Sequence, residues 1–199
     1  MSRSTPAFRL AFVGALVVAM VCGGLAAPVS AAAPEAWIVD KAASLIGFRS
    51  SFGGAAVNGA FTRWDAQIRF DPKALADSRV TVTIDPASAA TGDKDHDGAL
   101  PTADWFDVAH FPRASFTASA FKDLGGGHYL ALGALSIRGV MKSMALPFTL
   151  SITGDQAKMT SQVSVNRSVF GVGRGQFASA DTVPLQVGVE ISLTAKRAR

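Results

Sequence analysis

Residues 183–193 of this 199-residue chain read VPLQVGVEISL, with an aliphatic side chain at every second position from Val183 to Leu193. A period of two is typical of a β-strand that has one face buried and the other in water. The same alternation recurs clearly at 61–70 and 79–85, and more weakly at 37–52, 113–122, 128–138, 144–153 and 157–165. Segments with helical periodicity are almost absent. The pattern therefore predicts an all-β protein with eight candidate strands.

The connections between these candidate strands favour a closed sheet. Most of them carry turn signals such as Gly53-Gly54, Asp71-Pro72 and Gly125-Gly126-Gly127. Sequential strands joined by turns favour an eight-stranded antiparallel up-and-down barrel of the lipocalin type, because closure removes the exposed edges of the sheet. Residues 86–112 are too long for a hairpin turn. They predict a partly helical lid over the barrel, with Asp104 as a helix N-cap.

The N-terminus has the features of a secretory signal peptide. Arg3 and Arg9 flank the start of an apolar run at 10–21, and small residues follow at 30–33. This run is short for a membrane span, which needs about 20 apolar residues. We therefore expect a signal peptide at 1–32, a mature barrel domain at 33–199 with a short basic tail, and a periplasmic or secreted location. An uncleaved membrane anchor is the alternative.

Cysteine and charge counts narrow the classes of function. Cys22 is the only cysteine and lies within the predicted leader, so the mature chain has no disulfide and no cysteine-based metal site. Part of the formal charge of +4 comes from the leader and the tail, and the other basic residues are scattered singly. A nucleic-acid interface would need a clustered basic face. We expect no nucleic-acid partner, whereas the basic tail leaves peripheral contact with an anionic membrane open.

The inward-facing residues decide whether the barrel is solid or hollow. An eight-stranded barrel is just wide enough to be filled by side chains or to hold one small ligand. Small residues at expected inward positions are mixed with large aromatic ones, and the small ones are Ala66, Ala118, Ala120, Ala131 and Gly133. Periodicity leaves both a packed core and a channel open.

Several motifs occur in a fixed order over nearly all of residues 36–195. They include Trp37-Ile38-Val39-Asp40, Ile68-Arg69-Phe70-Asp71-Pro72, Asp104-Trp105-Phe106-Asp107-Val108 and Asn166-Arg167-Ser168-Val169-Phe170-Gly171. In this order they resemble the YceI family of exported, lipocalin-like polyisoprenoid-binding proteins. Many family members carry histidines where this chain has Ala43 and Phe52, so any head-group contact made by those imidazoles is absent here. Phe52 is expected to make its end of the interior more apolar.

The resemblance implies a non-enzymatic protein that holds a polyisoprenoid or isoprenoid-quinone chain non-covalently in its apolar interior, without a cofactor. A homodimer is compatible with it. Arg167 and Arg174 are candidates for contact with a polar head group, although we favour a buried structural role for Arg167, with a carboxylate partner. The predicted ligand-binding residues are Phe48, Phe52, Phe61, Phe70, Trp105, Phe106, Phe116, Tyr129, Leu135, Phe148 and Phe170.

Other classes of function leave weaker signals. The main alternative is an envelope structural or stress-related interaction module with a solid core and no ligand. A hydrolase is third, because the sequence has no Gly-x-Ser-x-Gly elbow. Asp93, Asp95 and Asp97 approximate a calcium-binding loop, but Pro101 and the preceding strand count against it. The three histidines lack metal-ligand spacing, so neither a metal site nor a catalytic residue is expected.

Overall fold

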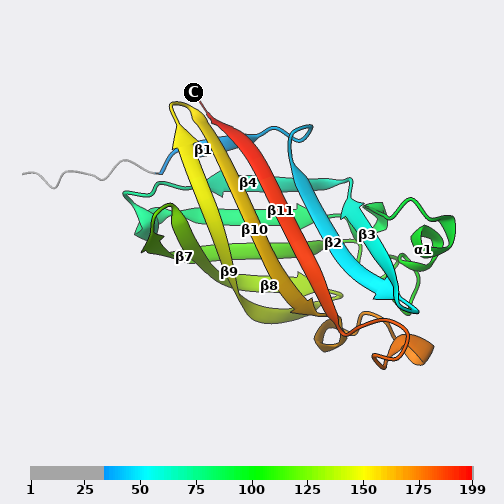
Figure 1. Ribbon diagram of the computed structural model, residues 1–199. Helices are drawn as coiled ribbons and strands as arrows, with labels where there is room; N and C mark the ends of the chain where they lie inside the picture. Colours follow the sequence, from blue (N-terminus) through cyan, green and yellow to red (C-terminus); the bar gives the residue numbers. More distant parts are fainter. Residues whose placement is uncertain (1–33, 199) are drawn as a thin grey trace, which may run out of the picture. The chain divides into compact units, whose positions relative to one another are not determined.

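A computed structural model describes residues 34–198, which form an antiparallel β-barrel with short helical segments (Figure 1). The predicted signal peptide at 1–32 lies outside the described residues. Eight strands close the ring in the order β1 (Ala36–Val39), β4 (Trp64–Arg69), β5 (Arg79–Ile84), β7 (Ala114–Gly125), β8 (His128–Ile137), β9 (Val140–Thr153), β10 (Gln156–Asn166) and β11 (Gln186–Arg197). Antiparallel pairing of β1 with β11 completes the ring. The predicted fold class is confirmed.

Three further strands extend the sheet from β11 in the order β2 (Leu45–Phe52), β3 (Ala55–Phe61) and β6 (Ala89–Ala90). The predicted single strand at 37–52 is in fact β1 and β2, because the Asp40 carboxylate accepts hydrogen bonds from the Ala42 and Ala43 amides and turns the chain. Strand β3 was not predicted as a separate element. Its small residues give little alternation, and Gly59 is required there because a Cβ would lie 2.3 Å from the Phe48 ring.

A β-bulge in β7 reverses the side-chain alternation. The register against β8 shifts between Ala118 and Ala120, so Ala118 is buried whereas Ala120 is exposed on the outer face. The prediction that both alanines point inward is therefore wrong for Ala120. An extra residue in one strand moves the following side chains to the opposite face, which brings Phe121 inward.

The pairing of β9 with β10 stops early. Their ladder runs from the connecting turn only as far as Thr149 opposite Thr160. Two residues before Thr149 on β9 is Pro147, which has no N–H. It therefore cannot donate the next hydrogen bond of the ladder to β10. Its carbonyl instead accepts a hydrogen bond from the Ser161 hydroxyl, at 2.6 Å. One side-chain bond thus replaces backbone pairing at this seam.

Two segments lie at the end of the barrel opposite the β9–β10 turn (Figure 1). The first, residues 86–112, contains η2 (Pro86–Ser88), β6 and α1 (Lys94–Ala99) and is the partly helical insertion that was predicted. The second, residues 167–185, contains η3 (Arg167–Phe170) and η4 (Gly175–Phe177). We call the end of the barrel that carries these two segments the lid end, and we call the opposite end the closed end. A further short helical turn, η1 (Leu75–Asp77), follows β4.

The helix cap in the first lid segment differs from the prediction. The N-cap of α1 is Asp93, whose carboxylate accepts hydrogen bonds from the Asp95 and His96 amides. Asp104 lies in the turns that follow α1, and its carbonyl accepts hydrogen bonds from the Gly173 and Arg174 amides. Asp104 therefore joins the two lid segments instead of beginning a helix.

Candidate ligand-binding cavity

The barrel encloses a cavity of about 330 Å³. All eight strands of the ring contribute to its wall, together with β2, β3 and both lid segments. The wall is almost entirely apolar, and the volume lies within the range of roughly 300–1,000 Å³ that is usual for small-molecule sites. The structure therefore favours the hollow barrel over the solid core that periodicity left open.

Nine of the eleven predicted ligand-binding residues line this one cavity. Ligand contact by them remains a prediction, but the structure brings them together although they come from distant parts of the chain. They are Phe48, Phe52, Phe61, Phe70, Trp105, Phe106, Phe116, Leu135 and Phe148.

Tyr129 and Phe170 are the two residues that do not line the cavity. Both are buried, at 8% and 3% exposure. The Tyr129 ring stacks on Phe148 with the centroids 5.4 Å apart, and burial together with the nearby Asp123 charge raises the pKa of its hydroxyl. The structure therefore places these two residues behind the wall, in packing positions.

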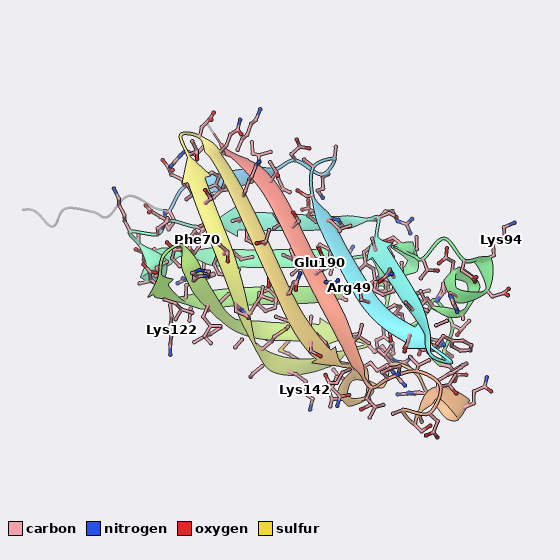
Figure 2. The ribbon with its side chains drawn as sticks, in the orientation of Figure 1. Arg49, Phe70, Lys94, Lys122, Lys142 and Glu190 are labelled. Carbon is pink, nitrogen blue, oxygen red and sulfur yellow. The ribbon has the colours of Figure 1, made fainter. Side chains whose placement is uncertain are left out.

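The closed end is sealed by a cluster of aromatic rings around Phe70. The Phe70 centroid lies 5.3 Å from Phe121, 5.6 Å from Tyr129 and 5.9 Å from Phe148, each ring edge-on. At the same end, the Trp37 indole, which also lines the cavity, donates a 2.9 Å hydrogen bond to the Phe70 carbonyl. Figure 2 shows Phe70 at the end remote from Lys94 of α1. Packed and hydrogen-bonded in this way, the closed end forms the floor of the cavity.

The lid end is looser and partly open. Phe52 at the tip of β2 lines the cavity yet is 42% exposed. Its ring centroid lies 5.5 Å from the His96 imidazole and 6.4 Å from Phe177, which in turn lies 5.1 Å from Trp105. A ring that touches both the interior and solvent marks the mouth of the cavity.

Arg167 occupies the wall at this end but is held by the backbone. It is 4% exposed, and its guanidinium donates to five carbonyl oxygens, those of Val172, Gly173, Ser179, Val183 and Pro184. These bonds fold the second lid segment around the side chain. Burial lowers the pKa of Arg167. The partners are carbonyl groups and not the carboxylate that was expected.

Glycine makes this close approach possible. Gly173 has a φ of +78°, and a Cβ on it would lie 2.1 Å from an Arg167 Nη1 atom. Gly171 and Gly175 also have positive φ, a left-handed backbone conformation that glycine adopts without steric cost. Arg174, the second head-group candidate, is exposed and does not line the cavity.

A buried ion pair fixes the first lid segment to the barrel. Arg138, in the β8–β9 turn, donates hydrogen bonds to the carbonyls of Ala103 and Trp105 and lies 3.4 Å from the Asp107 carboxylate. The other Asp107 oxygen is 2.8 Å from His110 Nδ1. These two partners hold the pKa of Asp107 below its usual range, with the His110 hydrogen bond the larger cause. We call Arg138, Asp107 and His110 the lid clamp.

The predicted ligand-binding residues omit much of the cavity wall. Aliphatic residues of β5, β10 and β11 supply large parts of it, and their alternation was visible, but the predicted ligand-binding set emphasised aromatic residues. Nothing in the sequence pattern marked three further wall residues, Ser50, His96 and Phe177, as part of the site. The aliphatic wall residues on these three strands are Val80, Val82, Ile84, Ala157, Met159, Val163, Val165, Val187, Val189, Ile191, Leu193 and Ala195.

Within residues 34–198, no group of three or more His, Cys, Asp or Glu side chains is arranged to hold a metal ion. The same residues contain no helix of the length and hydropathy needed to cross a bilayer. The Asp93 carboxylate accepts a hydrogen bond from the Asp95 amide, and the Asp97 carboxylate accepts one from the Thr91 hydroxyl.

A closed antiparallel barrel around one apolar cavity defines a class of β-barrel proteins that includes the lipocalins, in which function resides in the interior. Within that class, residues 37–195 match the YceI-like domain, and the chain belongs to this family.

Curated relatives and solved structures agree with this assignment. A UPF0312 protein of Pseudomonas savastanoi pv. phaseolicola is 26% identical over 163 residues, covering 77% of this chain and 84% of its own. BcnA of Burkholderia cenocepacia superposes with a TM-score of 0.76 at 32% identity, over 79% of this chain and 99% of its own. A polyisoprenoid-binding domain from Saccharophagus degradans shares the fold, with a TM-score of 0.67 at 17% identity over 82% of this chain and 99% of its own.

Proposed function

We propose that this protein is an exported, non-enzymatic lipid-binding protein that holds a polyisoprenoid or isoprenoid-quinone chain in the barrel. The observation that carries the proposal is the apolar cavity, closed at one end and partly open at the other. A long chain enters such a cavity tail first, and its polar end stays at the lid end.

The energetics of burial support an apolar chain as the ligand. Transfer of one CH₂ group from water is worth about 0.8 kcal/mol, so one isoprene unit contributes several kcal/mol before ordering costs. Four or more units outweigh an association cost of roughly 4–15 kcal/mol. Affinity then depends on buried area, whereas selectivity depends on chain length and on the mouth.

The comparisons support the same class of ligand. The neighbour from Saccharophagus degradans is described as a polyisoprenoid-binding domain, and it shares the barrel that encloses the cavity in this chain. The predicted leader at 1–32 supports a periplasmic or secreted location. No cofactor or catalytic group is needed, because holding and shielding a hydrocarbon requires only the dry interior.

Native mass spectrometry tests the proposal directly. Protein purified from a membrane-containing host is expected to carry one prenyl lipid per chain, which organic solvent extracts and which rebinds on titration. Only unliganded mass, together with no rebinding of prenyl alcohols, would contradict the proposal.

A pair of matched variants distinguishes a ligand in the cavity from one on the surface. Ala66 lines the cavity and Ala120 is exposed on the outer face. Ala66→Phe fills interior space and is expected to lower prenyl-lipid binding at least about tenfold, with a modest loss of stability of about 1–3 kcal/mol. Ala120→Phe adds the same side chain outside and is expected to leave binding unchanged.

A further inference from the structure

Most strands of the ring have a polar outer face, as expected for a sheet with one face in water. Side chains alternate between the two faces of a strand, so the residues between the cavity-lining ones point outward. On β4, β5, β10 and β11 these outward residues are mainly charged, Thr, Ser or Gln, and they include Asp65, Gln67, Thr81, Thr83, Lys158, Gln162, Glu190 and Ser192.

The hairpin of β8 and β9 departs from this pattern. Ala131 on β8 and Leu146 on β9 lie opposite each other and line the cavity, so their neighbours along each strand point outward. Met141 is 69% exposed and Leu132 is 36% exposed. We call the outward residues of this hairpin, together with Ala120 of β7, the hairpin face; they are Ala120, Leu130, Leu132, Ala134, Met141, Ser143, Ala145 and Pro147.

The apolar residues of the hairpin face adjoin one another. Leu132 lies opposite Ala120 on one side and Ala145 on the other, and Leu130 lies opposite Pro147. Opposite residues on one face of an antiparallel sheet have Cβ atoms about 4.5–5.5 Å apart. The hairpin face is therefore a continuous apolar surface, and such a surface marks an interaction site.

The charges around the hairpin face are positive. Lys122 of β7 lies opposite Leu130, and Lys142 follows Met141. Both lysines are exposed, and Figure 2 shows them pointing away from the same, lower side of the barrel. Strands β8, β9 and β10 contain no Asp or Glu. The partner of this face is therefore expected to be apolar and negatively charged.

A second copy of this chain fits the hairpin face poorly. A two-fold dimer brings the same surface of both copies together. Lys122 and Lys142 would then face another lysine-bearing surface, and β8, β9 and β10 offer no carboxylate to pair with them. Like charges brought together at an interface oppose association.

An anionic lipid bilayer supplies both features that the hairpin face requires. Its head groups attract lysines near the membrane surface, and its acyl boundary accepts apolar side chains. The same strand connects this face to the cavity, because Leu146 and Phe148 of β9 line the cavity whereas Ala145 and Pro147 point outward. A bilayer on the hairpin face thus lies one strand away from the cavity.

We propose that the hairpin face is a docking surface for an anionic lipid bilayer. This goes beyond the proposed function, because docking requires no ligand in the cavity. The surface is also distinct from the basic C-terminal tail, whose Lys196 is at the end of β11.

Sedimentation with vesicles tests the docking surface. The probes are vesicles of phosphatidylcholine alone and of phosphatidylcholine mixed with phosphatidylglycerol, neither of which contains a prenyl lipid. The wild-type protein is expected to bind the anionic vesicles about tenfold or more tighter than the neutral ones, because each lysine near an anionic surface contributes about fivefold. Equal binding to both, or no binding to the anionic vesicles, would overturn the proposal.

Lysine variants assign the binding to the hairpin face. The double variant Lys122→Gln, Lys142→Gln is expected to bind anionic vesicles about tenfold or more weakly. The matched control is Lys94→Gln, Lys196→Gln, which removes two exposed lysines from α1 and from the C-terminal tail and is expected to change binding less than about twofold. A larger loss in the control pair than in the hairpin pair, or equal losses, would contradict the proposal.

A second pair of variants tests the apolar part of the face. Met141→Gln is expected to weaken vesicle binding about threefold or more, because the side chain no longer gains from leaving water. Ile38→Gln is the control, since Ile38 of β1 is also exposed, at 64%, but lies outside the hairpin face. Equal losses in the two variants would contradict the assignment.

Two further measurements separate the alternatives. Light scattering without vesicles is expected to give the mass of one chain; a dimer that Met141→Gln dissociates would assign the face to a second copy and overturn the proposal. Titration with a prenyl alcohol in the absence of vesicles tests the proposed function on its own. Prenyl-alcohol binding without vesicle binding means that only the docking surface fails, and the reverse result means that only the proposed function fails.

Discussion

The closed end and the lid end of the barrel both contain aromatic side chains, but the two sets differ in burial and packing. At the closed end, Phe70 is 5% exposed and three rings pack edge-on around it. At the lid end, Phe52 is 42% exposed, and within the described part of the chain its ring lies near those of His96 and Phe177 alone. Aromatic side chains therefore stabilise the fold at one end and border an opening at the other.

The polar groups of the two ends differ in the same way. At the closed end the Trp37 indole donates to the Phe70 carbonyl, whereas at the lid end the Trp105 indole has no hydrogen-bond partner among residues 34–198. A saturated donor contributes to stability, and an unsaturated one costs stability until something binds it. The contrast indicates that the polar groups of the closed end are the more completely paired in the folded protein.

The largest expected effect is on stability at the closed end. Phe70→Ala removes the centre of the aromatic cluster and is expected to destabilise the protein by about 3–5 kcal/mol. Phe52→Ala, the same change at the lid end, is expected to cost less than about 1 kcal/mol because the ring is already half in water. Urea unfolding of both variants checks this, and equal losses would remove the distinction between the two ends.

The next largest effect is the difference in stability between variants of the two arginines in the second lid segment. Arg167→Met leaves five backbone carbonyls without their donor and is expected to cost about 3 kcal/mol. Arg174→Met is expected to change stability by no more than about 0.5 kcal/mol, since its side chain is exposed. Urea unfolding measures both. Similar values for the two variants would show that the buried bonds do not hold this segment.

Gly59 tests how tightly the wall near the lid is packed. Gly59→Ala places a Cβ 2.3 Å from the Phe48 ring and 2.9 Å from the Ala90 carbonyl oxygen, so the Phe48 ring, which lines the cavity, must shift. We expect a loss of about 1–3 kcal/mol in stability and weaker prenyl-lipid binding. Gly98→Ala in α1, where a Cβ meets nothing within 4 Å, is the control and is expected to be neutral or slightly stabilising. Unaltered binding in Gly59→Ala would mean that Phe48 does not border the ligand.

The smallest effect is the pH dependence of the lid clamp. The pKa of Asp107 is lowered in the folded protein by His110 and Arg138. Its contribution to stability is therefore present above the unfolded pKa, near 4, and is lost as the pH falls through the lower folded pKa. Asp107→Asn is expected to be less stable than the wild type at pH 6, with the difference shrinking below about pH 4. A difference that is constant from pH 6 to pH 3 in urea unfolding would contradict this.

The sequence predicted most of the barrel because inward and outward residues alternate along its strands. The alternation from Val183 to Leu193, for example, locates much of β11. The prediction failed where a local irregularity interrupts this alternation, as at the bulge in β7, after which Ala120 points outward. It also failed for β3, whose small residues carry almost no pattern.

The site was predictable in part for a related reason. Aromatic residues attached to recognisable motifs, such as Trp105 and Phe106, line the cavity as expected. The partners of Arg167 could not be predicted, because they are carbonyls, which every residue has, placed by the folding of one loop. Ser50 was missed because an isolated serine in a strand carries no signal until its surroundings are known.

Calorimetric titration of the lipid-free protein with a prenyl alcohol at several temperatures tests whether the barrel interior holds an isoprenoid chain. Saturable binding of one molecule per chain is expected, with a negative heat-capacity change, the mark of buried apolar surface. Heats that never saturate, or saturable binding with no change in heat capacity, would contradict it.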